Sequence, residues 1–147
     1  MAILPKSTFS GGVHVPDMKY LSSGKAIEVM PEPEKVYISL GQHIGKPAAP
    51  VVNVGDHVKK GQLIASQDGF ISANIYSSVS GVVEDIKPLV THVGKQTYVV
   101  IKSDGLGEEQ LLPPIDVNDK AAIIARVQQA GLVGLGGAGF PNYVKNT

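Results

Sequence analysis

The chain has 147 residues, and its 13 basic and 13 acidic side chains give a formal net charge of zero. A balanced charge provides no field that attracts nucleic acid or an anionic membrane surface, so neither is expected as a direct partner. The sequence has no run of about 18 apolar residues that could span a bilayer, and its lack of cysteine excludes disulfides, thiolate zinc sites and iron–sulfur ligation within this chain.

The first 35 residues are expected to form an extended arm. Gly11, Gly12 and Pro16 disfavour a helix, and residues 26–30 are predicted to be a short strand or an extended piece. A lone histidine such as His14 or His43 is more often structural than a metal ligand or proton carrier. The first six residues lack the apolar core of a secretory signal, so the compartment expected by default is the cytoplasm.

Residues 36–103 have the pattern of a mainly-β domain. The stretch from Val36 to Leu40 alternates apolar and polar side chains, as in a half-buried strand, and residues 97–102 predict the strand that closes the domain. Between them, two short apolar runs flank the turns at Gly55 and Gly81. Glycine reaches positive φ without steric cost, so we expect positive φ at both turns.

The spacing V-x-V-G-D-x-V-K-K-G-Q-x-I-A … S-G-V-V over residues 52–83 resembles the biotinyl/lipoyl-type flattened barrel, or barrel-sandwich hybrid. In carrier domains of that type the hairpin tip presents a lysine that is acylated by biotin or lipoate. The corresponding tip here, residues 67–74, contains no lysine. The carrier function is therefore expected to be lost, which favours a scaffold or docking surface.

A linker over residues 104–116 is predicted from its acidic turn residues and from Pro113-Pro114. Asp116 and Asn118 can cap a helix over residues 117–130, because their side chains accept hydrogen bonds from its free amides. Apolar residues recur there at helical spacing, and Gly131 provides the stop. The apolar stripe of this helix requires a covering surface.

The end of the sequence, residues 131–145, is rich in glycine: GLVGLGGAGFPNYVK. Pro141 suits the first turn of a following helix. A glycine-rich loop that enters a helix exposes backbone amides where the helix dipole is positive, which favours a phosphate, and Lys145 adds a cation. Glycines also serve tight turns and close packing, so the loop alone is equally compatible with a structural role.

Residues 134–141, Gly-Leu-Gly-Gly-Ala-Gly-Phe-Pro, followed by Lys145, resemble the flavin-binding loop of the NADH-oxidising subunit of respiratory complex I. The likeness is closer to the RnfC subunit of the Rnf electron-transport complex, an ion-translocating ferredoxin:NAD oxidoreductase. Further matching stretches are FSGGVH (9–14), QHIG (42–45), VGDHVKKGQ (54–62) and SSVSG (77–81). Several motifs in the same order are far more specific than any one of them.

The resemblance implies a membrane-associated complex that moves electrons between ferredoxin and NAD, coupled to sodium or proton transport. Its RnfC subunit would lie peripherally on the cytoplasmic side of the membrane and would contact the other subunits, with ferredoxin and NADH as indirect partners. The family carries flavin mononucleotide (FMN) and two four-iron–four-sulfur clusters, and handles NAD(H). The resemblance also implies which residues bind the cofactor. The backbone amides around Gly134, Gly136, Gly137 and Gly139 would face the flavin phosphate or the edge of the cofactor. Phe140 would pack against the nucleotide, and Lys145 would contact FMN.

The sequence also departs from its relatives. Leu135 stands where complex I relatives have an arginine, Val15 and Asp17 where Rnf relatives commonly have proline and glutamate, and Tyr76 where a histidine is common. The family's cysteine-rich cluster segment and the rest of its flavin fold do not occur within these 147 residues.

We therefore expect residues 117–147 to begin a truncated α/β flavin/NADH domain. The chain would be an N-terminal fragment that is inactive by itself and binds FMN weakly or not at all. The alternative is a non-catalytic biotinyl/lipoyl-like scaffold or adaptor. A periplasmic adaptor would be expected to have long flanking coiled-coil heptads, and none is present.

Overall fold

The computed structural model describes residues 15–92 and 94–145. The chain divides into two compact units, residues 1–30 and residues 31–147. In the first unit, the described residues 15–30 are exposed and contain a short 3-10 helix, η1 (Lys19–Leu21). Residues 26–30 form no strand. The predictions for Gly11, Gly12 and His14 lie outside the described residues.

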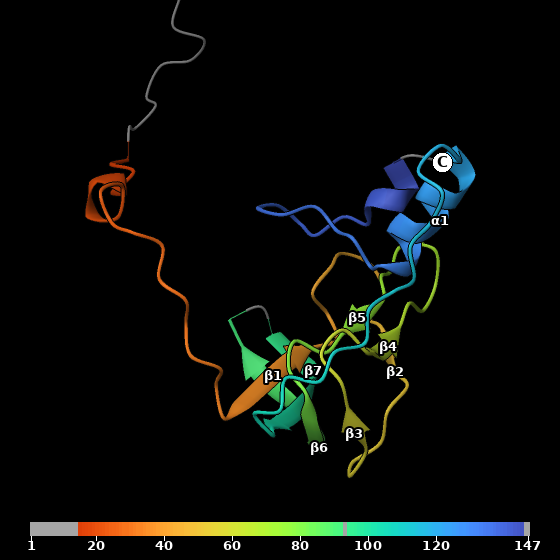
Figure 1. Cartoon of the computed structure of the whole chain (residues 1–147), viewed down its shortest axis with the longest axis horizontal. Coiled ribbons are helices and arrows are strands. Elements are labelled where there is room, and N and C mark those ends of the chain that lie inside the picture. Colours follow the sequence, from red (N-terminus) through yellow and green to blue (C-terminus); the bar gives the residue numbers. More distant parts are fainter. Residues whose placement is uncertain (1–14, 93, 146–147) are drawn as a thin grey trace, which may run out of the picture. The chain divides into compact units, whose positions relative to one another are not determined.

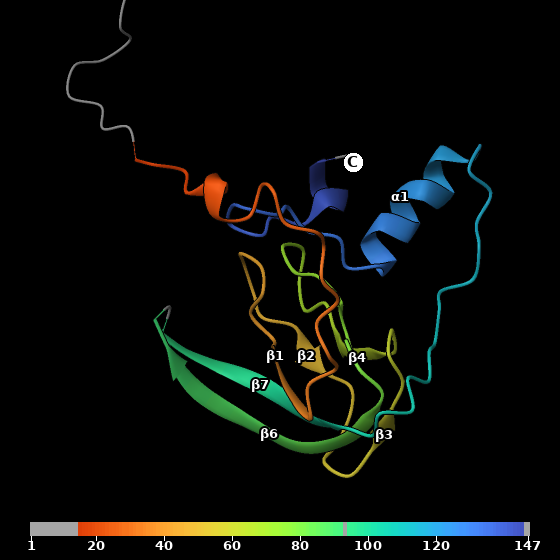
Figure 2. The same ribbon diagram turned by 60° about the vertical axis from the view of Figure 1, so that its left-hand side comes forward.

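The second unit is mainly β, as predicted, and contains two antiparallel sheets (Figure 1). The larger sheet has the strand order β1 (Lys35–Ser39), β7 (Gly94–Ser103), β6 (Gly81–Thr91), β3 (His57–Val58). The smaller sheet has the order β2 (Ala49–Pro50), β4 (Leu63–Ser66), β5 (Ile75–Tyr76). The long β6–β7 hairpin curls under the smaller sheet (Figure 2), so together the sheets form a barrel-sandwich.

The core of the barrel lies between the two sheets. Side chains alternate across a strand, and in β1 this buries Ile38 while Tyr37 is half exposed. The buried apolar cluster contains Ile38, Leu40, Ala48, Val52, Val58, Ile64, Ala65, Ile75, Val79, Val83, Val99 and Ile101. Members come from both sheets and from the turns between them, so apolar burial joins the sheets into one body.

Gly55 and Gly81 both have positive φ, as predicted, with values of 94° and 155°. Gly55 lies in the predicted turn, whereas the turn predicted at Gly81 is wrong, because this residue begins strand β6 and pairs with Ser103. The two glycines are required for different reasons. A Cβ at Gly55 would meet nothing within 4 Å, whereas a Cβ at Gly81 would lie 2.0 Å from the carbonyl oxygen of Lys102 on the neighbouring strand. Gly81 is therefore fixed by close backbone approach in addition to its φ.

Strand β6 continues through Pro88, which pairs with Thr97. The strand predicted over residues 97–102 is confirmed as part of β7. Proline is tolerated on a strand where its missing N–H would have no ladder partner. In the described part of the sheet β3 pairs only with Gly81 and Val82, so at Pro88 the strand β6 has β7 on one side alone.

The predicted helix is present as α1 (Lys120–Gln129). Its N-cap is Asp119, whose carboxylate accepts hydrogen bonds from the backbone N–H groups of Ala121 and Ala122, at 2.9 and 3.2 Å. The predicted caps Asp116 and Asn118 are wrong, because the carboxylate of Asp116 accepts from the N–H of Asn118 in a turn before the helix. Gly131 ends the helix with φ 65°, as expected for a C-terminal stop.

Candidate functional site

The glycine-rich segment folds back on itself as a narrow loop. Val133 and Pro141 form an antiparallel bridge, and the N–H of Gly134 donates to the carbonyl of Phe140 at 2.9 Å. Residues 135–139 form the tip of this loop. The amide of Gly134 is therefore already used within the loop, and the exposed backbone lies nearer the tip.

The glycines of this loop differ in what the fold requires of them. Gly136 has φ 80°, and Gly139 has φ 66° with its Cα against the barrel, where a Cβ would lie 2.7 Å from the carbonyl oxygen of Gln42. Gly137 has neither a positive φ nor any atom within 4 Å of a Cβ position. Among the described residues, no backbone strain or packing thus requires glycine at position 137, so its missing side chain leaves the tip open to close approach by a ligand.

Residues 42–45 of the barrel contact this loop. The N–H of Ile44 donates to the carbonyl of Ala138 at 3.0 Å. The buried His43 accepts at Nε2 from the N–H of Ala73, and its Nδ1 lies 3.2 Å from the carbonyl oxygen of Ile44. Because Nε2 is an acceptor, Nδ1 carries the proton and donates. His43 therefore has a structural role, because it links residues 42–45, which contact the glycine-rich loop, to residues 67–74.

The hairpin tip at residues 67–74 is held by contacts on several sides. The side chain of Asn74 donates to the carbonyl of Gln129 at the end of α1 (3.0 Å), and the hydroxyl of Tyr143 donates to the carbonyl of Phe70. A Cβ on Gly131 would lie 2.0 Å from the carbonyl oxygen of Asn74, so the helix end rests directly on the tip backbone. The tip that presents a lysine in carrier domains is here a binding surface for the segment that follows the barrel.

Tyr76 also takes part in this contact. Its hydroxyl donates to the carbonyl of Gln129. Burial raises the pKa of the Tyr76 hydroxyl, while a hydrogen bond with Asn74 and the charge of Arg126 lower it by less. The hydroxyl therefore stays protonated at neutral pH and acts as a donor.

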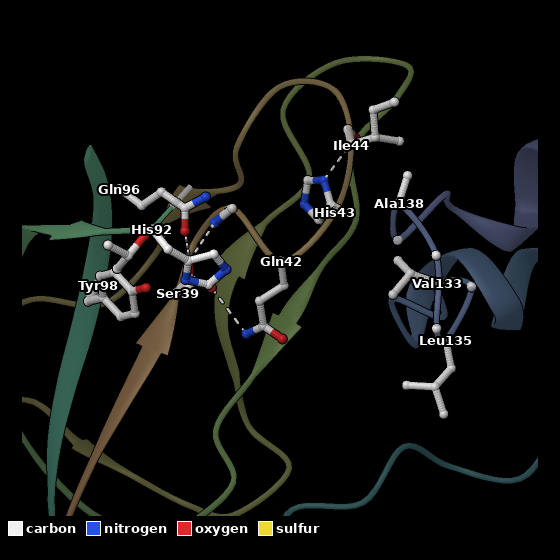
Figure 3. Close-up of a pocket in the computed structure, with 16 residues that line it drawn as sticks. Ser39, Gln42, His43, Ile44, His92, Gln96, Tyr98, Val133, Leu135 and Ala138 are labelled. Carbon is white, nitrogen blue, oxygen red and sulfur yellow. Dashed lines mark hydrogen bonds between the residues drawn. The ribbon is translucent and has the colours of Figure 1, made fainter. Parts of the chain in front are cut away.

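An open pocket of about 780 Å³ separates the glycine-rich loop from the barrel (Figure 3). One wall consists of residues 133–139, which include all four predicted glycines. The other wall comes from the barrel: Ser39 and residues 41–44 after β1, together with Thr91, His92, Gln96 and Tyr98 from the far end of the β6–β7 hairpin. Figure 3 shows Gln42 and His92 directed toward the space between the walls.

The polar side chains of the barrel wall are fixed by a hydrogen-bond network around Ser39. The hydroxyl of Ser39 donates to Oε1 of Gln96 at 2.9 Å and accepts from the N–H of Gly41 at 3.1 Å. The carbonyl of Ser39 accepts from Nε2 of Gln42 at 3.1 Å. Sequence reasoning did not select Ser39 or Gln96, and the only signal was that the QHIG motif lies directly after the strand that ends at Ser39.

The profile of the RnfC barrel sandwich hybrid domain matches residues 7–106 of the chain. The chain belongs to this family. Among its relatives, the C subunit of the proton-translocating ferredoxin:NAD(+) oxidoreductase complex of Clostridium ljungdahlii is 47% identical over 94% of the chain. The corresponding protein of the Na(+)-translocating complex of Acetobacterium woodii is 38% identical over 94% of the chain, and that of the ion-translocating oxidoreductase complex of Pseudomonas aeruginosa is 37% identical over 93%. The chain spans 31%, 32% and 18% of the lengths of these three relatives.

Two predicted site residues, Phe140 and Lys145, lie apart from the pocket lining. Nζ of Lys145 lies 5.7 Å from the ring centroid of Phe140, in a cation–π geometry. The helix expected after the loop is the four-residue 3-10 helix η2 (Asn142–Lys145), which is too short to carry a substantial dipole. The helix dipole expected to favour a phosphate is therefore small, which leaves the loop amides and Lys145 as the groups that could contact an anion.

The described part of the chain contains no group of three His, Cys, Asp or Glu side chains that could hold a metal ion. Within the same residues, no helix has the length and apolar character needed to cross a bilayer.

Proposed function

We propose that this chain is part of the RnfC subunit of an ion-translocating ferredoxin:NAD+ oxidoreductase complex. The observation that carries the proposal is the 47% identity over 94% of the chain with a relative from a complex of that kind, an alignment long enough to include most of the barrel and the segment after it. The protein would act peripherally at the cytoplasmic side of the cell membrane, where it would contact the other subunits of the complex. NADH and ferredoxin would be reached through the whole assembly.

In the complete protein, the glycine-rich loop would hold FMN or NAD(H). The pocket volume of about 780 Å³ is suited to such a ligand, since small-molecule sites occupy roughly 300–1,000 Å³. The glycine at position 137, which nothing within the described chain requires, supports a close approach of the ligand to the loop backbone. A bound flavin would supply electron transfer, while the residues of this chain would bind and orient it.

The iron–sulfur clusters implied by the family have no ligands in this chain, because its 147 residues contain no cysteine. Any clusters would be held by other residues of a complete protein. The role proposed for residues 134–145 is therefore restricted to nucleotide binding.

The test uses the protein made from the complete gene, with FMN content per protein and NADH-dependent reduction of ferricyanide as readouts. Gly137→Val should lower both, because a branched side chain blocks approach to the loop backbone. Lys145→Ala should weaken FMN retention by roughly 1.5–3 kcal/mol, the range of a hydrogen bond to a charged group.

Gly24→Val is the matched control, because Gly24 also has no positive φ and no atom within 4 Å of a Cβ position. It should leave the flavin content unchanged. If Gly137→Val and Lys145→Ala also kept full flavin, the loop would not be the cofactor site.

The isolated 147-residue chain should bind FMN weakly or not at all, because an anchored flavin also needs an apolar wall for its ring system. Fluorescence quenching during titration with FMN measures this. Micromolar or tighter binding by the isolated chain would contradict the expectation.

A scaffold without cofactor chemistry is the second candidate, and the occupied hairpin tip favours it. Residues 67–74 have no lysine, and this tip is bound by the end of α1 and by Tyr143. Co-expression with a biotin or lipoate ligase should give no covalent adduct by mass spectrometry. A complete protein with no flavin at the loop would favour the scaffold.

A further inference from the structure

We propose that the barrel forms the second wall of the nucleotide pocket, and that Gln42 and Gln96 recognise the hydrogen-bonding edge of an uncharged planar ring. The inference rests on the proposed function, because the glycine-rich loop forms the opposite wall. Flavin and nicotinamide rings share the required chemistry, an amide-like edge with donors and acceptors.

The first support is the direction in which the two glutamine side chains are fixed. Gln42 lines the pocket and uses Nε2 to donate to the carbonyl of Ser39. Its Oε1 is therefore the acceptor presented to a ligand. Gln96 uses Oε1 to accept from the hydroxyl of Ser39, which leaves its Nε2 as a donor. One fixed acceptor and one fixed donor match the edge of a carboxamide or of a flavin pyrimidine ring, where hydrogen-bond donors and acceptors alternate.

Pre-organisation is the second support. Ser39 binds both glutamines, so the two side chains are held by one residue at the end of β1. A side chain that is already fixed loses little rotamer freedom when a ligand binds, and this raises affinity. Gly41 keeps the arrangement compact, since a Cβ there would lie 3.2 Å from Nε2 of Gln96.

The charge of the lining is the third support. Among the described lining residues there is no Asp, Glu, Lys or Arg. A phosphate placed against this wall would have no lysine or arginine to pair with, whereas an uncharged ring needs none. Lys145 lies outside the lining, so phosphate and ring are assigned to different sides of the loop.

Apolar contacts complete the fit to a ring. Leu135 at the tip of the loop is fully exposed, and Ile44 on the barrel side is 47% exposed. Both line the pocket. Leu135 and Val133 lie on the loop side of the space in Figure 3, across from Gln42. A planar ring would cover apolar surface with its faces and meet the glutamines with its edge.

The test is made on the protein from the complete gene, with FMN, riboflavin and NADH as probes. Gln96→Leu removes the donor toward the ligand without adding a charge. Gln42→Leu removes the acceptor. Each variant should weaken ring binding roughly three- to tenfold, the effect of one neutral hydrogen bond.

The three probes distinguish the source of the ring. If the ring is the flavin, FMN and riboflavin lose affinity by the same factor, because the phosphate does not touch this wall, and NADH binding to the flavin-loaded protein is unchanged. If the ring is nicotinamide, only NADH binding weakens. A loss seen with FMN but not with riboflavin or NADH would overturn the proposal, since it would place the phosphate at the glutamines.

Gln62→Leu is the matched control, a barrel glutamine that lies outside the pocket lining and bonds the N–H of Lys59. It should leave all three affinities and the melting temperature near those of the parent. Unchanged affinities in both Gln96→Leu and Gln42→Leu, with flavin lost in Gly137→Val, would overturn the barrel wall and leave the proposed function standing. Unchanged affinities for all three probes in all three variants would overturn both.

Discussion

The barrel and helix α1 are held in place by different forces. The barrel encloses a cluster of twelve buried apolar residues shared by its two sheets. Helix α1 has no buried residue, and Ile123 on its apolar side is still 40% exposed. Its end is fixed by hydrogen bonds to the carbonyl of Gln129 and by the close approach of Gly131 to the barrel tip.

This difference shows that stability and positioning are separate properties of the molecule. Apolar burial provides most of the free energy of folding, so the barrel should unfold as a unit. Hydrogen bonds to backbone carbonyls contribute less net free energy but fix geometry. The barrel therefore acts as the stable body, and the glycine-rich loop is positioned upon it.

The largest expected effect comes from the barrel core. Ile64 on β4 is fully buried, and Ile64→Ala should lower the free energy of unfolding by roughly 2–5 kcal/mol, because lost burial is combined with a cavity. Thermal denaturation measures the change. Val90→Ala is the control, because Val90 is 83% exposed. Equal melting temperatures for the two variants would contradict a core centred between the sheets.

Substitutions at Gly55 and Gly81 should separate the cost of backbone strain from the cost of steric overlap. Gly55→Val should destabilise the barrel by about 1–2 kcal/mol, because only its positive φ is strained. Gly81→Val should cost about 3 kcal/mol, since the added Cβ also meets the carbonyl of Lys102. Denaturant titration measures both. The two assignments are wrong if both variants melt like the parent, and the steric argument alone is wrong if they melt alike.

The attachment of α1 should be breakable without unfolding the barrel. Gly131→Ala places a Cβ 2.0 Å from the carbonyl oxygen of Asn74, so the helix end must move, at a local cost of roughly 1–3 kcal/mol. Amide hydrogen exchange should become faster in α1 and stay slow at Val99 and Val100 in the barrel.

Gly105→Ala is the control for this change, because Gly105 has a similar φ of 70° and no atom within 4 Å of a Cβ position. It should leave the exchange of α1 as in the parent. Faster exchange throughout the barrel in Gly131→Ala would mean that the helix and the barrel unfold as one unit.

The smallest expected effect is a pH dependence of the free energy of unfolding, which arises from Asp104 directly after β7. The hydroxyl of Ser80, the N–H of Leu106 and then His57 hydrogen-bond Asp104 and lower the pKa of its carboxyl. A lowered folded pKa stabilises the protein above the unfolded pKa of about 3.9, and this contribution is lost as pH falls through the folded pKa.

Asp104→Asn should therefore slightly reduce the free energy of unfolding at pH 7. In this variant the free energy of unfolding should also fall less steeply below about pH 4 than in the parent. Urea titrations at pH 7 and pH 3 measure the difference. An unchanged decline in acid would remove Asp104 as a contributor.

The sequence predicted features that depend on neighbouring residues. The turn at Gly55 and the positive φ of both Gly55 and Gly81 follow from local glycine dipeptides. The existence of α1 and its stop at Gly131 follow from helical spacing and a C-terminal glycine. The N-cap was wrong by a few residues because Asp116 satisfies a nearby N–H in its own turn, a competition that spacing does not reveal.

The barrel wall of the pocket was not predictable in the same way. Ser39 and Gln96 meet because β1 pairs with β7, where Ser39 lies opposite Tyr98. That register joins residues far apart in the sequence and depends on how the whole sheet assembles. The glycines of the loop were identified from their motif, whereas the residues across the pocket from them carry no local pattern.

The pairing of β1 with β7 also sets the order in which the barrel forms. Residues 35–39 pair with residues 98–102, whereas the β6–β7 hairpin joins neighbours such as Thr91 and Gly94. A local hairpin closes faster than a long-range pair, so β1 docks onto a hairpin that already exists. During synthesis β1 leaves the ribosome well before its partner, and the sheet is completed only after Ser103 has emerged. Until then the backbone edge of β1 lacks its hydrogen-bonding partner, and an unpaired edge of this kind can pair with another chain.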